Sequence, residues 1–147
     1  MFPIFPTDQE VARLAAFKTS KFPIAPNAAQ FKLFVNSVTP DVNSTIATFT
    51  EATTPGYTAR DVIMNTPDAL PSGLAVCQSG TILNDITGTN DPPESAYGYF
   101  VTNQAGDELI FAENFSAPIL LETGTRIFGV CRISQPNTNY GWVDLAN

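Results

Sequence analysis

The sequence predicts an all-β fold: a single-domain antiparallel β-sandwich, jelly-roll-like in form, with a short N-terminal helix. Short apolar runs alternate with turn residues about every 8–12 positions, which is the spacing of strands in sandwiches and barrels. Twelve of the 147 residues are proline, and proline is excluded from helix interiors and central strands. Only 14% of the residues are charged, whereas helices favour Glu, Lys and Arg.

The one strong helical pattern lies near the N-terminus. The stretch TDQE is a capping box, in which the side chains of Thr7 and Glu10 each accept from the other residue's backbone amide. Apolar residues from Val11 to Ala15 follow at helical spacing, so a helix is expected over residues 8–19. The two prolines of KFPIAPN end it.

From residue 30 the apolar pattern becomes alternating, which is typical of strands. About eight strands are expected, with a short further strand around Trp142. The expected strands are residues 30–36, 58–64, 73–79, 81–87, 96–102, 108–114, 118–122 and 125–133. Gly106 in NQAGD suits a hairpin loop. The chain therefore divides into an N-terminal arm and helix, residues 1–29, and a β-sandwich domain, residues 30–147.

Residues 33–57, LFVNSVTPDVNSTIATFTEATTPGY, combine a strand, a polar loop and a Pro-Gly turn. A single helical turn is expected near residues 45–52, with Asn43 or Ser44 as its N-cap and Phe49 pointing inward. None of these residue types in this pattern indicates catalysis. The segment is therefore expected to have a structural role.

The charges are unevenly distributed along an acidic chain of net charge −7. Nucleic-acid-binding proteins need a basic surface, so contact with DNA or RNA is not expected. Residues 1–32 hold four of the seven basic residues but only two of the fourteen acidic ones. Either these charges cluster by chance on a solvated surface, or the arm docks on an acidic neighbour. In the second case the interface residues are Phe2, Phe5, Arg13, Lys18 and Lys21.

No membrane or targeting segment is predicted. No apolar run approaches the roughly 18 residues of a membrane-spanning helix, so no membrane partner is expected. The start, MFPIFPTDQE, lacks the basic region and long apolar core of a signal peptide. The two cysteines, Cys77 and Cys131, are expected to be buried, chemically quiet thiols. A disulfide between them stays open as the alternative, because both lie in strand-like runs.

The candidate chemistry is sparse, and no catalytic residue, cofactor or metal site is expected. The chain has no histidine, which excludes Ser-His-Asp and Cys-His sites and the commonest metal ligand. Paired carboxylates, Glu51 with Asp61 or Glu108 with Glu113, have the chemistry of glycoside hydrolysis. Carboxylates on a solvated β surface explain them better. The protein is therefore not expected to be an enzyme.

Two further features admit a binding role. The stretch NDITGTNDPPE offers the hard oxygen ligands of a calcium site, but without the spacing of a calcium loop, so an Asx-rich turn is favoured. Tyr97 and Tyr99 alternate along one expected strand and are predicted to share a face. An exposed face of this kind could stack on sugars. Tyrosine is also simply common in strands, and this second explanation is favoured.

Two segments resemble a pattern found in small uncharacterised structural proteins of tailed bacteriophages. In the first segment the matching residues are Leu33, Phe34, Asn36, Thr39, Pro40, Phe49, Thr50, Glu51, Ala52, Gly56 and Tyr57. In the second, YGYFVTNQAGDELIFAENF, they are Gly98, Tyr99, Val101, Thr102, Gly106, Leu109, Ala112, Glu113 and Phe115. The resemblance covers residues 31–133. Its two recurring acids, Glu51 and Glu113, are expected to cap backbone amides.

The resemblance implies a non-enzymatic virion protein, synthesised in the host cytoplasm. It would be a capsid decoration or a component associated with the tail or its fibres, acting through subunit contacts. Its partners would be major capsid or tail proteins, and it would form homo-oligomers. The alternative function is a glycan-binding module that recognises a host surface polysaccharide through exposed Tyr97 and Tyr99.

Overall fold

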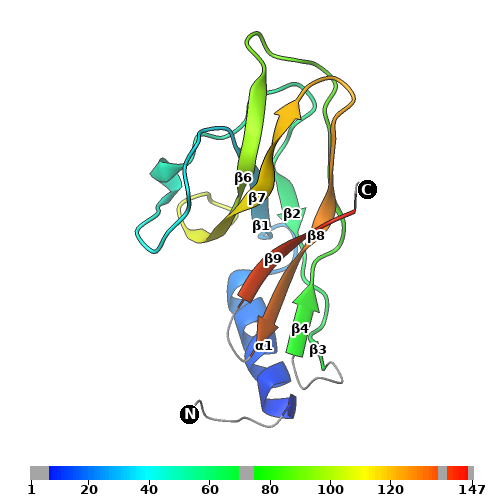
Figure 1. The fold of residues 1–147 in the computed structure, drawn as a ribbon. Helices are drawn as coiled ribbons and strands as arrows, with labels where there is room; N and C mark the ends of the chain where they lie inside the picture. Colours follow the sequence, from blue (N-terminus) through cyan, green and yellow to red (C-terminus); the bar gives the residue numbers. More distant parts are fainter. Residues whose placement is uncertain (1–6, 70–74, 136–138, 146–147) are drawn as a thin grey trace.

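The computed structural model describes residues 7–69, 75–135 and 139–145. Its strands form two antiparallel sheets (Figure 1). The first sheet contains, in spatial order, β2 (Arg60–Val62), β1 (Ala29–Phe34), β6 (Glu94–Thr102) and β7 (Leu109–Leu121). The second contains β3 (Asp68–Ala69), β4 (Ala75–Gln78), β5 (Ile82–Asp85), β8 (Arg126–Gln135) and β9 (Asn139–Asp144). The predicted all-β, sandwich-like fold with one short helix is confirmed.

Strand β8 is the centre of the second sheet. Its two halves pair with β4 and β5, which lie end to end along one edge of β8. The opposite edge pairs with β9, so that Trp142 faces Cys131 across the ladder. The two-residue strand β3 extends this sheet beyond β4 and was not predicted.

The first sheet departs from prediction at β7. Two separate strands, residues 108–114 and 118–122, were expected because Pro118 cannot donate to a ladder. A single strand runs through both, and the register with β6 jumps from Gly98↔Asn114 to Ala96↔Ile119. One residue of β6 therefore faces four residues of β7. This large bulge accommodates the proline without ending the strand.

The main core lies between the two sheets. It contains Phe31, Leu33, Tyr99 and Val101 from the first sheet, all fully buried. Residues of β4, β5 and β8 face them from the second sheet, including Ile133 and both cysteines. This alternation of buried and outward residues along the strands is what the period-two pattern predicted.

The helix α1 (Thr7–Lys21) begins one residue before the predicted start and ends two residues after the predicted end. It packs on its own chain. It contacts β3, β4 and β8 at one end of the sandwich (Figure 1). Leu14 is completely buried in the main core, and Phe22, just after the helix, is 2% exposed. The helical part of the arm therefore packs on the sandwich of its own chain.

The segment after β1 covers the outer face of the first sheet. Phe49 packs there on Phe34 and Phe100, with ring centroids 4.9 and 5.0 Å apart. The side chain of Asn36 fixes the returning chain, donating to the Thr48 carbonyl (2.9 Å) and accepting from the Thr50 amide (2.8 Å). The expected structural role is thus the closure of a second, smaller apolar cluster.

The predicted helical turn is present as the 3₁₀ helix η1 (Ile46–Thr48). Its N-cap is Thr45, whose backbone amide donates to the Thr48 hydroxyl (2.9 Å), so the expected caps Asn43 and Ser44 were wrong. The Pro-Gly turn that follows has Gly56 at φ +92°. A Cβ on Gly56 would lie 2.2 Å from the carbonyl oxygen of Asp85, so this turn packs closely on the end of β5.

Across the described part of the chain, no helix combines the length and the apolar character needed to cross a membrane.

Candidate functional site

The two recurring acids accept from tyrosine hydroxyls. The Tyr57 hydroxyl donates to Glu51 (2.8 Å) and accepts from the Leu33 amide (3.3 Å), which joins the turn to β1. The Tyr99 hydroxyl donates to Glu113 (2.9 Å). Burial, reinforced by the adjacent carboxylate, raises the pKa of Tyr57 above its ordinary value. The predicted capping of backbone amides by these acids was wrong, because Glu51 accepts from the hydroxyl of partly buried Tyr57 and Glu113 accepts from that of buried Tyr99.

A different acid, Glu94, does cap backbone. Its carboxylate accepts from the Thr53 amide (2.8 Å), the buried Thr54 hydroxyl (2.6 Å) and the Asn90 side chain (3.2 Å). Burial acts to raise the pKa of Glu94, but the hydrogen bonds from Thr54 and Thr53 outweigh it, and the net pKa lies below its ordinary value.

Replacing Glu94 with Gln should lower the free energy of unfolding at neutral pH by about 1 kcal/mol, because a neutral acceptor replaces a charged one. A group with a lowered folded pKa stabilises above its unfolded pKa and loses that contribution as the pH falls. The gap between wild type and variant should therefore close below about pH 4. Urea unfolding at a series of pH values measures this. Exposed Glu122→Gln is the control, and an equal gap for both variants would contradict the assignment.

Tyr97 and Tyr99 do not share a face. Tyr99 is fully buried in the main core, whereas Tyr97 packs against the outer cluster of Phe34, Phe49 and Phe100. The tyrosines flank Gly98, beside the register jump between β6 and β7, so strand alternation is broken there. The prediction of a shared face was wrong, and Tyr99 is not accessible to a glycan.

The other candidate groups are dispersed. Asp61 accepts from Gln30 (2.6 Å), Asp85 pairs with Arg126 (2.9 Å), and Glu108 pairs with Lys21. Among the described residues, no three His, Cys, Asp or Glu side chains gather as a metal site would require. The oxygen-rich stretch NDITGTNDPPE is divided between β5, a loop and the start of β6.

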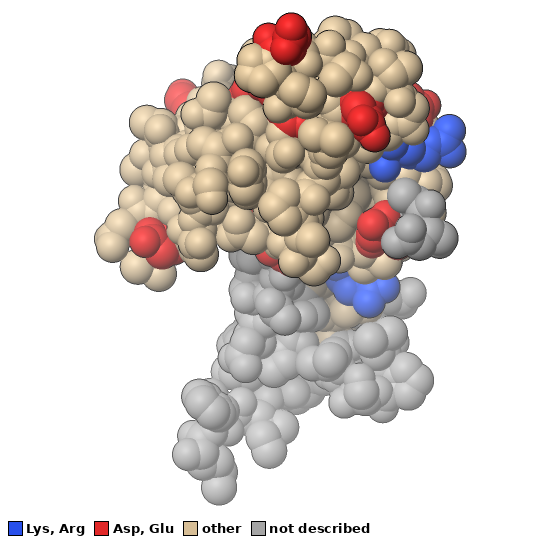
Figure 2. Space-filling model, turned by 45° about the horizontal axis from the view of Figure 1, so that its top comes forward, with Lys and Arg blue, Asp and Glu red and all other residues tan. Residues whose placement is uncertain are grey.

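The predicted interface residues fall into two groups. Phe2 and Phe5 lie outside the described residues, as does the side chain of Arg13. Lys18 and Lys21 lie on α1, and the ion pair of Lys21 with Glu108 stays within the chain. On the face shown in Figure 2, acidic side chains form separate spots in a largely uncharged surface.

Both cysteines are buried free thiols, as expected. Burial raises the pKa of Cys77 against a smaller lowering effect of Lys18. Burial, with the charge of Glu113 as a smaller cause, raises the pKa of Cys131 to about 12. We therefore expect both thiols to react slowly with thiol reagents. The thiolate is the reactive form, and a raised pKa leaves little thiolate at neutral pH.

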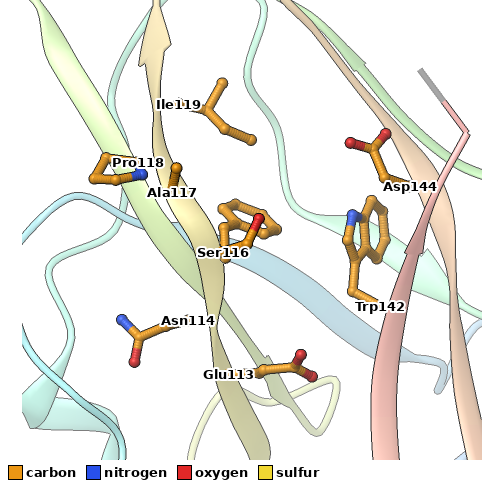
Figure 3. A pocket seen from close by; sticks show the side chains of 9 residues that line it. Glu113, Asn114, Ser116, Ala117, Pro118, Ile119, Trp142 and Asp144 are labelled. Carbon is orange, nitrogen blue, oxygen red and sulfur yellow. The ribbon is translucent and has the colours of Figure 1, made fainter. Parts of the chain in front are cut away.

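A polar cavity lies between strands β7 and β9 (Figure 3). It has a volume of about 390 Å³ and is lined by residues 113–119 of β7 with Trp142 and Asp144 of β9. The side chains of Glu113 and Asp144 point into the space between the two strands, with Trp142 beside them (Figure 3). We call this cavity the β7–β9 cleft.

Neither Trp142 nor Asp144 was predicted from the sequence to belong to a functional site. One signal was available: the only tryptophan of the chain stands two positions before an acid, so both side chains belong to one strand face. Their proximity to Glu113 depends on β9 pairing with β8, a long-range contact that no local pattern predicts.

Comparison of the chain with protein-family models, with curated protein sequences and with solved structures finds no match.

Proposed function

We propose that this protein is a non-enzymatic structural component of a tailed-phage virion, a capsid decoration or a tail- or fibre-associated protein that acts through subunit contacts. The sequence resemblance over residues 31–133 supports this proposal. One observation of the structure carries it: an apolar groove is lined by β7, the last strand of the first sheet among the described residues.

This groove has a volume of about 530 Å³ and lies between residues 109–112 of β7 and the loop containing Pro40, Asp41, Val42 and Ser44. Val42 is 99% exposed at its wall. In the described part of the first sheet β7 is the last strand, and Glu113 is its only charged residue. Soluble proteins usually protect such edges with charges or short strands, so a long, nearly uncharged edge favours an interface.

The occupant we propose is the segment of residues 1–6, MFPIFP, of a second copy. It contains Phe2 and Phe5 and no charged side chain, which suits the composition of the groove. Six extended residues span about 20 Å, and the four β7 residues of the groove span about 13 Å. Because α1 packs on its own chain, we assign the contact with a neighbour to residues 1–6 and not to the helix.

Deleting residues 2–6, or replacing Val42 with Ser, should abolish self-association while leaving the circular dichroism spectrum unchanged. Ile24→Ser is the matched control, since it also removes an exposed aliphatic side chain, 74% exposed, away from the groove. Light scattering across a concentration series, with electron microscopy of the assemblies, measures the outcome. A wild-type protein that stays monomeric, or a deletion variant that associates normally, would refute the proposed contact.

A second candidate function is recognition of a host surface polysaccharide. The specific observation that favours it is the β7–β9 cleft, which places an aromatic ring between two carboxylates.

A further inference from the structure

We propose that the β7–β9 cleft binds a neutral or amine-bearing saccharide unit, with Trp142 as the stacking surface and Glu113 and Asp144 as hydrogen-bond acceptors. This inference deepens the second candidate function and rests on it. It replaces the tyrosine pair expected from the sequence with a site made by the two edge strands.

The pairing of β6 with β7 in the first sheet shapes one side of the cleft. Four residues of β7 face one residue of β6 at the large bulge. β7 therefore leaves the ladder there and forms one wall of the cleft. Ser116, Ala117 and Pro118 are exposed on this wall. The volume of about 390 Å³ lies at the small end of the range for ligand pockets, which suits one or two sugar rings.

Trp142 packs against aromatic rings of the core and is partly exposed. It stacks on Phe31 with ring centroids 5.0 Å apart and an interplanar angle of 25°. A Cβ on Gly129 would lie 2.4 Å from the indole, so glycine at this position makes room for the ring. A fixed aromatic surface stacks on the apolar C–H face of a sugar with little loss of conformational entropy.

The acids in the cleft provide acceptors with defined orientation. One oxygen of Glu113 is held by the hydroxyl of buried Tyr99 at 2.9 Å, which fixes the carboxylate against the cleft wall. Asp144 approaches from the other strand (Figure 3). Ionised carboxylates only accept hydrogen bonds, and sugar hydroxyls and ammonium groups donate them.

The charge of the cleft determines which saccharides fit. Two carboxylates line it, and the chain carries a net charge of −7. Uronic and sialic acids would bring further negative charge to an acidic chain, beside the carboxylate of Glu113, so we expect them to be repelled. Neutral hexose oligomers and glucosamine oligomers meet no such repulsion.

Intrinsic tryptophan fluorescence reports directly on the cleft, because Trp142 is the only tryptophan of the chain. Titration with neutral glucan oligomers and with glucosamine oligomers should give saturable changes in tryptophan fluorescence and protection from acrylamide quenching. Oligogalacturonate, the acidic probe, should give neither. No saturable change with any neutral or amine-bearing oligomer would overturn the inference.

A matched pair of variants locates the site. Ala117→Phe fills the cleft at an exposed position, and Ala105→Phe adds the same ring in the exposed β6–β7 hairpin loop. Affinity, measured by calorimetry, should fall at least about tenfold for Ala117→Phe and stay within about twofold for Ala105→Phe. Glycan binding that survives Ala117→Phe would refute this site and leave glycan recognition standing at another surface. The assembly measured with the Val42 variant is independent of either outcome.

Discussion

Replacing Gly98 with Ala should leave a protein that unfolds well below the wild-type melting temperature. A Cβ at this position would lie 2.2 Å from the Glu113 carbonyl oxygen, 2.7 Å from the Phe34 ring and 2.8 Å from the Asn114 Cα. Two of these three atoms belong to the β7 backbone, which cannot move without breaking the ladder. Overpacking typically costs about 1–3 kcal/mol, and we expect about 3 kcal/mol or more here.

For a domain of this size, that loss lowers the melting temperature by about 6–12 °C. Gly80→Ala is the control, because nothing lies within 4 Å of a Cβ there. Thermal unfolding followed by circular dichroism should separate the two variants clearly. A Gly98 variant as stable as the Gly80 variant would mean that β6 and β7 do not approach as described. The β7–β9 cleft would then lose its β7 wall, because the register jump beside Gly98 produces both this wall and the close approach of β6 and β7.

Replacing Leu14 with Ala should cost about 2–5 kcal/mol of the free energy of unfolding, as large-to-small changes in cores do. Leu14 is completely buried, and its helix packs against β3, β4 and β8. The expected loss distinguishes a helix that belongs to the core from an arm that only docks on a neighbour. An isolated helix of this length is marginal in water, so its order depends on this packing.

Leu120→Ala is the matched control, since it removes the same atoms from a side chain that is 45% exposed. Urea unfolding should show a large decrease in the transition midpoint for Leu14→Ala and a small one for Leu120→Ala. If both decreases are small, the sandwich folds without the helix, and the division at residue 29 marks an independent arm. If the Leu14 decrease is large, deleting the whole arm will prevent folding, so assembly must be tested with the shorter deletion of residues 2–6.

Local patterns in the sequence determined the elements of this protein. The capping box and the apolar spacing after it predicted the helix, and it forms as Thr7–Lys21. Alternating apolar residues predicted β1, β6 and β8 within a few residues, because backbone geometry places every second side chain on one face. Gly106, at φ +77°, forms the expected hairpin turn between β6 and β7.

Tertiary structure alone decided where the candidate site lies. The register jump beside Gly98 sends Tyr97 and Tyr99 to opposite faces, although strict alternation predicts one face. Trp142 comes to lie beside Glu113 only because β9 pairs with β8 and both sheets end on the same side. Strand register and sheet packing bring together residues that are far apart in the chain. The free energy that selects a register or a packing arrangement therefore comes from long-range contacts, which no window of neighbouring residues contains.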